Sequence, residues 1–228
     1  MPPTSAEPAP PARKAILIVD DHPVLRRGLA ALIDSSSDLT VCAEAATCAA
    51  ALAAIREHSP DLVIVDLVLG GADGLELIKE MKAQHPQIPA LVLSMHDEAL
   101  YAERALRAGA RGYVNKQQLD DTVLVAIGRV LGGETYISDK LKAQFATQFV
   151  AGRTLQTDSP LNALSDRELQ VFRLIGQCRS TRAIAQALNL SVKTIESHRE
   201  HIKQKLGLES AAELARRATL WVETGGAG

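Results

Sequence analysis

Residues 14–131 alternate between short apolar runs and stretches with the period of an amphipathic helix, and this alternation constrains the fold more than any other feature. The apolar runs lie at residues 15–19, 39–42, 61–65, 90–93 and 112–114. Uninterrupted apolar strands that alternate with helices are typical of a parallel sheet whose two faces are both covered. The sequence therefore predicts a doubly wound α/β domain with a five-stranded parallel sheet.

The carboxyl ends of four predicted strands carry side chains suited to polar chemistry. They are Asp20 and Asp21 after the first strand, Asp66 after the third, Ser94 after the fourth and Lys116 after the fifth. Ligand sites in open parallel sheets lie beyond the carboxyl ends of the strands, so we expect these side chains to meet on one rim. Each residue alone has an ordinary structural explanation, such as capping a helix or facing solvent. Their joint placement favours a functional site.

Three neighbouring carboxylates raise one another's pKa unless a cation joins them. Mg²⁺ suits such a site because it prefers oxygen ligands and is held by a few carboxylates and waters. Asp66 could then act as a nucleophile toward phosphorus. Lys116 would neutralise charge on the transferred phosphoryl group, and Ser94 could donate a hydrogen bond to it. The rim is thus predicted to be a phosphoaspartate site.

Residues 164–228 show only helical patterns. Ser165 and Ser210 are each followed three residues later by a glutamate, which is the spacing of a capping box at the start of a helix. Between them, residues 181–188 and 191–206 predict two helices joined by a tight turn, the arrangement of a helix-turn-helix. We therefore expect an all-α, four-helix domain.

Two sets of motifs carry a family resemblance over residues 14–220. The first set comprises Ile18-Val-Asp20-Asp21-His-Pro, Asp66, Ser94 and Gly112-Tyr-Val-Asn-Lys116. The second comprises Leu164-Ser-Asp-Arg-Glu168, Ile184-Ala185, Leu188, Ser191-Val-Lys-Thr-Ile-Glu-Ser-His-Arg199 and Lys205-Leu-Gly207. The first set resembles the receiver domain, and the second the DNA-binding domain, of the NarL/FixJ (LuxR-type) two-component response regulators.

By this resemblance the α/β domain has the flavodoxin-like receiver fold, and Asp66 is the phosphoacceptor for a histidine kinase. Ser94 and Tyr113 are the implied switch pair, in which the hydroxyl moves to the phosphate and the aromatic ring rotates inward behind it. The resemblance implies a Mg²⁺ site made of Asp20, Asp21, Asp66 and the main-chain carbonyl of Val68.

Some positions depart from the family pattern, and others flank the expected phosphorylation site. Leu69-Gly70 stand where the family often has Met-Pro, and glycine makes this loop more flexible than proline would. Val68 and His96 flank the site at positions thought to govern the access of water, and an apolar Val68 would slow hydrolysis of the phosphoaspartate. Cys178 occupies a position where the family commonly has glycine.

The helix predicted to begin after Ser191 is the one expected to enter the major groove of DNA. Ile195, Ile202 and Leu206 share its buried face. By similarity to the family, we expect base contacts from Glu196, Ser197 and Glu200. We expect phosphate contacts from Lys193, Thr194, Lys203 and Lys205, with His201 on a shoulder of the same face. The alternative, a solvated helix in a domain that does not touch DNA, stays open.

The domain organisation follows from these patterns. We expect a disordered leader at 1–13, a receiver domain at 14–136, a linker at 137–162, a LuxR-type helix-turn-helix DNA-binding domain at 163–222 and a tail at 223–228. The linker is polar and contains a proline, and its Phe145 and Phe149 favour a helical turn.

Composition and charge bear on the kind of partner and on the cellular compartment. Residues 1–163 contain 20 acidic and 15 basic side chains, whereas residues 164–228 contain 7 acidic and 10 basic ones. A polyanionic partner is therefore expected at the C-terminal domain. The chain has neither a signal-peptide pattern nor an apolar run long enough for a membrane helix, and its 3 cysteines lack metal-ligand spacing. We expect a cytoplasmic protein with reduced thiols.

These observations predict a phosphorylation-activated transcriptional regulator that binds promoter DNA and forms a homodimer when phosphorylated. The helix over residues 209–221 is a candidate dimer contact, although its apolar side chains could equally be core. One alternative is a receiver-like regulator that works independently of phosphorylation. Another is an aspartyl-phosphate phosphohydrolase with a helical cap, but such enzymes prefer a second acid two residues beyond the nucleophile. We therefore class the protein as a regulator and not as an enzyme.

Overall fold

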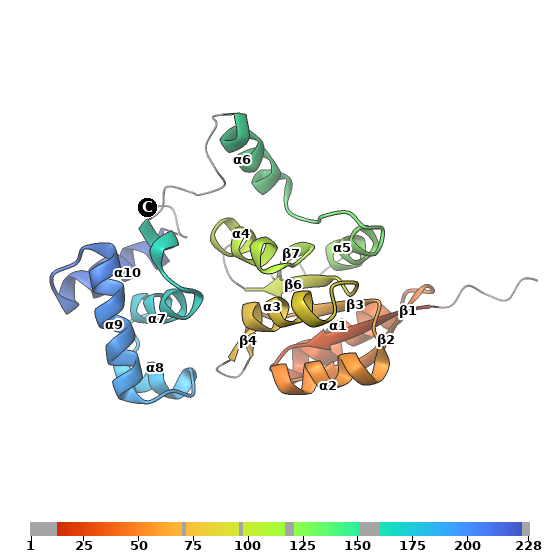
Figure 1. The fold of residues 1–228 in the computed structure, drawn as a ribbon, viewed down its shortest axis with the longest axis horizontal. Coiled ribbons are helices and arrows are strands. Elements are labelled where there is room, and N and C mark those ends of the chain that lie inside the picture. Colours follow the sequence, from red (N-terminus) through yellow and green to blue (C-terminus); the bar gives the residue numbers. More distant parts are fainter. Residues whose placement is uncertain (1–12, 70–71, 96–97, 117–120, 151–159, 225–228) are drawn as a thin grey trace, which may run out of the picture.

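The computed structural model describes residues 13–69, 72–95, 98–116, 121–150 and 160–224. Five parallel strands form one sheet in the order β2-β1-β3-β6-β7. They are β1 (Lys14–Val19), β2 (Leu39–Ala45), β3 (Leu62–Val65), β6 (Ala90–Ser94) and β7 (Gly112–Asn115). The predicted five-stranded parallel sheet is therefore confirmed, with β3 at its centre between β1 and β6 (Figure 1).

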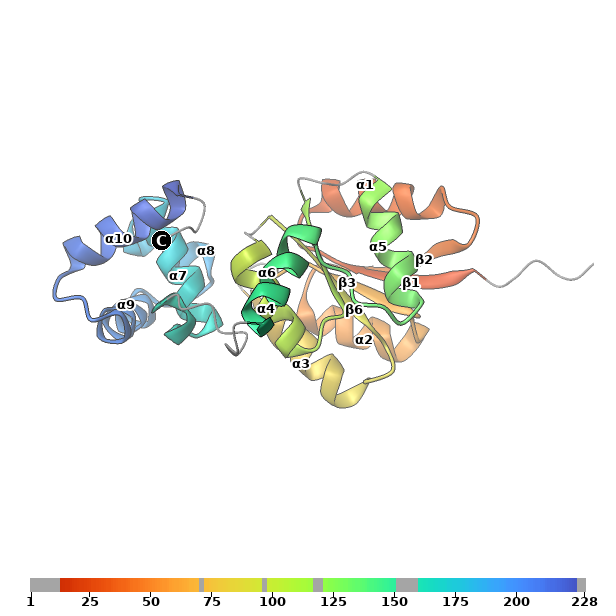
Figure 2. The same cartoon turned by 90° about the horizontal axis from the view of Figure 1, so that it is seen from above.

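Helices cover both faces of this sheet. They are α1 (Pro23–Asp34), α2 (Cys48–His58), α3 (Gly74–Gln84), α4 (Glu98–Ala108) and α5 (Asp121–Leu131). Side chains that alternate along a strand point to opposite faces, so Ile16 and Ile18 pack with α1 and α5, whereas Leu17 and Val19 pack with the helices of the other face. Figure 2 shows α1 and α5 together on one side of the sheet.

The structure adds a hairpin that was not predicted and a helix that is longer than expected. After β3 the chain forms a small antiparallel hairpin of β4 (Val68–Leu69) and β5 (Ala72–Asp73) before α3 begins. The helix α6 (Asp139–Val150) has 12 residues, so the prediction of a single helical turn within the linker was too short. Gly70 and His96, which bear on the sequence-based expectations for the loops, lie outside the described residues.

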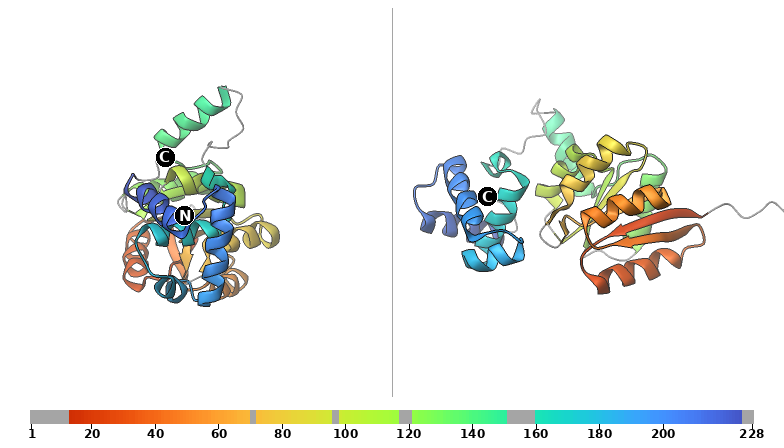
Figure 3. Two further views of the ribbon diagram at one scale, coloured as in Figure 1. Left: turned by 90° about the vertical axis from the view of Figure 1, so that its left-hand side faces the viewer. Right: turned by 60° about the horizontal axis from the view of Figure 1, so that its bottom comes forward.

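The C-terminal helices form a separate domain at one side of the molecule (Figure 3). They are the 3-10 helix η2 (Pro160–Ala163) and the α-helices α7 (Asp166–Gly176), α8 (Thr181–Ala187), α9 (Val192–Leu206) and α10 (Ala211–Glu223). The rings of Phe172 and Trp221 pack with their centroids 5.8 Å apart in its core. α7 and α10 approach so closely that a Cβ atom on Gly176 would lie 2.3 Å from the carbonyl oxygen of Ala218.

Local capping signals start these helices. The first predicted capping box is confirmed, because Ser165 accepts from the amide of Glu168 and the Glu168 carboxylate accepts from the amide of Ser165. The second prediction was half right. Ser210 caps α10 by accepting from the amide of Glu213, but the Glu213 carboxylate accepts from the amide of Glu209. No helix in the described part of the chain is long and apolar enough to cross a membrane.

Candidate phosphorylation site and DNA-reading helix

The carboxyl ends of β1, β3 and β7 bring three charged side chains together. The Lys116 ammonium lies 2.6 Å from Asp20 Oδ2 and 2.6 Å from Asp66 Oδ2. All three residues are buried, with exposed fractions of 3% for Asp20, 5% for Asp66 and 6% for Lys116. Because one ammonium bridges two carboxylates, these side chains are held in a fixed arrangement at the rim of the sheet.

Asp21 joins the same cluster. Ligand atoms of Asp20, Asp21, His22 and Asp66 all lie within 4.8 Å of one another. The three carboxylates and the single ammonium of Lys116 leave two negative charges when His22 is neutral. Oxygen ligands with this surplus charge fit a divalent cation such as Mg²⁺.

The environment of Asp66 perturbs its acidity. Desolvation by burial raises the pKa of Asp66 to about 6, against the opposing effect of the Lys116 ammonium, which lowers it. The main-chain N–H of Val68 also lowers the pKa of Asp66 by hydrogen bonding to it. The Lys116 ammonium thus offsets part of the effect of burial on the Asp66 carboxyl group.

The candidate switch residues lie near this rim on adjacent strands. Ser94 ends β6 and Tyr113 lies on β7, and their exposed fractions are 0% and 1%. The register pairs Ser94 with Asn115, one residue before Lys116. Hydroxyl, amine and carboxylate groups therefore come from neighbouring strand ends, as the sequence predicts.

Sequence reasoning missed two residues of this rim. The His22 Nδ1 atom lies 3.2 Å from Asp20 Oδ1 and 2.8 Å from Asp21 Oδ1. Arg26 donates to the main-chain carbonyl of Asp20 at 2.5 Å and to Glu44 at 3.0 Å. The position of His22 directly after Asp21 was an available signal in the sequence. Nothing local pointed to Arg26, because its partners Asp20 and Glu44 belong to other parts of the sheet.

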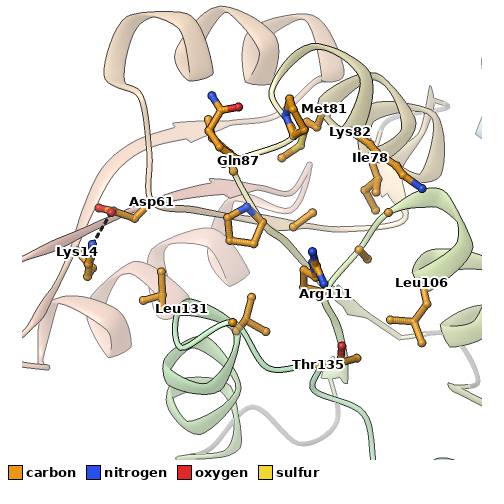
Figure 4. A pocket seen from close by; sticks show the side chains of 18 residues that line it. Lys14, Asp61, Ile78, Met81, Lys82, Gln87, Leu106, Arg111, Leu131 and Thr135 are labelled. Atoms are coloured by element: carbon orange, nitrogen blue, oxygen red, sulfur yellow. Dashed lines mark hydrogen bonds and ion pairs between the residues drawn. The ribbon is translucent and has the colours of Figure 1, made fainter.

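A cavity of about 780 Å³ lies elsewhere, between the amino ends of the strands and the ends of α3, α4 and α5 (Figure 4). Lys14 and Asp61 form an ion pair of 2.7 Å at its edge, while Arg111 and Lys82 also line it. The acidic cluster is at the opposite ends of the same strands. This cavity is therefore separate from the candidate phosphorylation site.

In the C-terminal domain, α9 has one buried and one exposed face. Ile195 and Ile202 are fully buried and Leu206 is 8% exposed, so the predicted buried stripe is confirmed. The residues predicted to contact bases are all exposed, namely Glu196, Ser197 and Glu200. The geometry thus offers these side chains to an external partner.

The expected phosphate-binding lysines differ in their surroundings. Lys205 lies 2.6 Å from the buried carboxylate of Glu168 on α7, and Lys203 lies 2.9 Å from Glu200. Lys193 is exposed and forms no ion pair among the described residues. Sequence reasoning missed Glu168 as a partner because that residue was assigned only to the capping box.

The other two candidates on this helix are also engaged within the domain. Thr194 Oγ1 lies 2.7 Å from the hydroxyl of Ser191, the N-cap of α9. His201 Nδ1 lies 3.8 Å from Glu168 Oε1. The first contact lies within the N-terminal turn of α9, and the second joins α9 to α7.

Both domains match known families. Residues 16–128 match the response regulator receiver domain, and residues 162–218 match the luxR family of bacterial regulatory proteins. The chain is 37% identical over 207 residues to the oxygen regulatory protein NreC of Staphylococcus aureus, which covers 89% of this chain and 95% of the relative. The chain belongs to the LuxR-type two-component response regulators.

Solved structures agree with this response regulator in fold. A LuxR-family two-component response regulator from Aurantimonas sp. SI85-9A1 is 33% identical, with a TM-score of 0.57, over 61% of this chain and 99% of that one. RcsB of Salmonella typhimurium aligns over 92% of this chain and 98% of its own with a TM-score of 0.66 at 24% identity. The response regulator therefore combines a receiver domain with a helix-turn-helix domain, and it is a DNA-binding transcriptional regulator of a two-component system.

Two positions of this response regulator that depart from the family pattern can be placed. Leu69 is buried, with an exposed fraction of 2%, and pairs with Ala72 in the hairpin that follows Asp66. Cys178 adopts a positive φ of 57°, a conformation that glycine reaches at lower cost. The usual glycine at that position is therefore explained by the backbone that this turn requires.

Proposed function

We propose that Asp66 is the phosphoacceptor of this response regulator and that a sensor histidine kinase supplies the phosphoryl group. The observation that carries this proposal is that Asp66 pairs with Lys116 at 2.6 Å and has ligand atoms of Asp20 and Asp21 within 4.8 Å. The Asp66 carboxylate attacks the phosphorus of the kinase phosphohistidine, so that an O–P bond forms while the N–P bond breaks and the kinase histidine leaves. The Lys116 ammonium offsets negative charge on the phosphoryl oxygens. Ser94 and Tyr113 are the proposed switch pair that reads the modified aspartate.

We further propose Mg²⁺ as the resident cation of this site. The residues that would hold it are Asp20, Asp21, Asp66 and the main-chain carbonyl of Val68. When bound, it supplies positive charge and orientation to a transferring phosphoryl group. The support for this assignment is the carboxylate donor set and its two surplus negative charges.

The output that we propose is binding of double-stranded promoter DNA by α9 in the cytoplasm. Base contacts are assigned to Glu196, Ser197 and Glu200. Phosphate contacts are assigned to Lys193, Thr194, Lys203 and Lys205, with His201 beside them. Lys193 forms no ion pair among the described residues, whereas Lys203 and Lys205 each do, so Lys193 should contribute most to phosphate binding.

We propose a homodimer as the active form. On the predicted contact helix, Leu214, Ala218 and Trp221 are buried within their own domain, which supports the intradomain reading of these three positions. Leu220 is 60% exposed on the same helix and is available to a second copy. We class the protein as a regulator and not as an enzyme, because the family to which it belongs consists of DNA-binding regulators.

Acetyl phosphate with Mg²⁺ tests this function directly. Intact-mass measurement should show one added phosphoryl group on the wild type and none on Asp66→Asn. Asp139→Asn is a matched control, because the Asp139 side chain is 97% exposed on α6. Phosphorylation of Asp66→Asn to the wild-type extent would overturn the assignment. Promoter output that is unchanged by Asp66→Asn would favour a regulator that works independently of phosphorylation.

A further inference from the structure

Arg26 of α1 joins two parts of the sheet that lie far apart in the sequence. Its Nη1 atom donates to the main-chain carbonyl of Asp20 at 2.5 Å, and its Nε atom donates to Glu44 Oε2 at 3.0 Å. The side chain of Arg26 is 17% exposed and that of Glu44 is 38% exposed. Because the donors of a guanidinium form a rigid planar fork, these two acceptors hold it in one orientation.

Strand β2 also holds the main-chain N–H of Asp20. This N–H donates to the carbonyl of Ala45 at 3.0 Å, and Ala45 follows Glu44 at the end of β2. Both polar groups of the Asp20 main chain are therefore connected to β2. The N–H is connected directly, and the carbonyl is connected through the side chain of Arg26.

The carbonyl of Asp20 belongs to the peptide group that joins two of the proposed cation ligands. Residues 20–22 form the turn that connects β1 to α1. Because a peptide group is planar, the direction of this carbonyl sets the direction in which the chain enters Asp21. A hydrogen bond to the carbonyl therefore acts on the position of both carboxylates.

The charge of Arg26 would act against a bound cation. A guanidinium has five N–H donors and no acceptor, so Arg26 cannot itself be a metal ligand. Its positive charge lies beside the acidic cluster and by Coulomb's law repels a divalent ion there. The Glu44 carboxylate pairs with this charge and offsets part of it. A favourable contribution of Arg26 to the cation site must therefore come from geometry.

We propose that Arg26, held by Glu44, is a positioning residue of the candidate phosphorylation site. It fixes the peptide group between Asp20 and Asp21, so that both carboxylates face Asp66. This inference rests on the proposed Mg²⁺ site. Without the guanidinium, the turn would have to be ordered when the ion binds, and this ordering lowers affinity. Groups that orient metal ligands typically contribute about 10- to 100-fold to metal affinity.

Titration of the full-length, unphosphorylated protein with Mn²⁺ tests the inference. Mn²⁺ suits the same oxygen ligands as Mg²⁺, and the electron paramagnetic resonance signal of free Mn²⁺ measures the bound fraction without any reaction. Arg26→Ala should raise the dissociation constant for Mn²⁺ by about tenfold or more. Mg²⁺ should compete with Mn²⁺ in the wild type, because both ions use the same carboxylates.

Arg27→Ala is the matched control. Arg27 is the next residue of α1, is exposed and forms no ion pair among the described residues. Each of the two variants loses one positive charge, a change that by itself favours the binding of a cation at the acidic cluster. Arg27→Ala should therefore leave the dissociation constant unchanged or lower it, whereas Arg26→Ala should raise it. The opposite signs separate positioning from charge.

Variants of Glu44 test the other end of the contact. Glu44→Ala releases Arg26 and should weaken Mn²⁺ binding, whereas Glu44→Gln removes the same charge but keeps an acceptor for Arg26 and should bind more tightly than Glu44→Ala. A double variant of Arg26→Ala with Glu44→Ala should bind no more weakly than Arg26→Ala alone, because the two side chains act as one unit. Arg26→Lys keeps a donor for the Asp20 carbonyl and should recover part of the lost affinity.

Phosphorylation by acetyl phosphate supplies a readout that a general loss of structure would not reproduce. The Mg²⁺ concentration that gives the half-maximal rate should rise by about tenfold in Arg26→Ala. The rate at saturating Mg²⁺ should stay within about twofold of the wild-type rate, because Arg26 acts on the ion and not on the phosphoryl group.

The outcomes are distinguishable. Wild-type affinity in Arg26→Ala, or an equal loss in Arg26→Ala and Arg27→Ala, would overturn the positioning role and leave the proposed function intact, provided that Asp21→Asn weakens Mn²⁺ binding. Mn²⁺ binding that is unchanged in Asp21→Asn would overturn the proposed cation site and the positioning role with it. If urea unfolding shows that Arg26→Ala does not fold, Glu44→Ala replaces it, and wild-type affinity in that variant overturns the positioning role.

Discussion

Replacement of Lys116 by alanine is the most direct perturbation of the candidate phosphorylation site. The variant leaves the buried carboxylates of Asp20 and Asp66 without the ammonium that lies 2.6 Å from each. Removal of one partner from a buried ion pair costs about 3–5 kcal/mol. We therefore expect Lys116→Ala to lower the free energy of unfolding by about 4 kcal/mol at about pH 8.

The pH dependence of this loss follows from the pKa of Asp66. Burial already raises that pKa to about 6 while Lys116 lowers it, so removal of Lys116 raises it further. Between about pH 4 and this raised value the folded variant binds more protons than the unfolded chain, and its stability increases as the pH falls. The wild type gains stability in the same way below about pH 6, where its own Asp66 protonates. The loss caused by Lys116→Ala therefore shrinks only between the raised pKa and about pH 6, by about 1.4 kcal/mol per pH unit, and should be smaller at about pH 5 than at about pH 8.

Urea unfolding followed by far-UV circular dichroism measures these free energies. The single tryptophan, Trp221, lies in the DNA-binding domain and would not report on the receiver. Lys140→Ala is the control, because Lys140 is exposed on α6. Mg²⁺ should raise the free energy of unfolding of Lys116→Ala, because a divalent cation neutralises the same carboxylates. A loss that is equal at both pH values, or larger at the lower one, would refute the assigned electrostatics.

Three further predictions concern other parts of the chain. Burial raises the pKa of Asp73 to about 6, so ionisation of this carboxyl group destabilises the folded protein. Asp73→Asn keeps the helix cap and removes that cost. In urea titrations it should be more stable than the wild type by up to about 3 kcal/mol above about pH 6, and equally stable below about pH 4. Gly176→Ala should lower the thermal stability of the DNA-binding domain because its Cβ meets a main-chain carbonyl of α10. Gly128→Ala, with open space around it, should instead stabilise by about 0.5–1 kcal/mol. Lys193→Ala should reduce the slope of log affinity for DNA against log salt concentration by about one, while Lys205→Ala, whose ammonium pairs within the domain, should change it less.

Contrary results would be equally informative. A stability difference for Asp73→Asn that grows toward low pH would reverse the sign of the assigned shift. A Gly176→Ala protein with unchanged thermal unfolding would show that α7 and α10 are not in close contact. A larger change in salt slope for Lys205→Ala than for Lys193→Ala would mean that the ion pair with Glu168 opens on DNA.

Local patterns in the sequence predicted most secondary structure and the place of the site. Apolar runs such as residues 62–65, alternating with helical patterns, are typical of buried parallel strands, and parallel strands bring their carboxyl ends to one rim. For that reason the sequence alone predicts that Asp20, Asp66 and Lys116 lie together. The cap at Ser165 was equally readable, because its partner is three residues away.

The sequence did not reveal features that depend on the path of the chain through space. The hairpin of β4 and β5 has strands of two residues, too short to show a period. α6 lies in a segment whose polar composition suggested a linker, and its helical period was too weak to extend the predicted turn.

The sequence by itself determined two domains, a rim of acids with one lysine, and a helix with an apolar stripe and a polar face. These are properties of residues that are close in the chain or that are placed by the regular geometry of a parallel sheet. The tertiary structure alone decided which cation meets which anion over long separations, as for Arg104 with Asp166 and Lys205 with Glu168. The physical reason is that the energy of an ion pair depends on distance and burial in the folded protein, and sequence separation encodes neither.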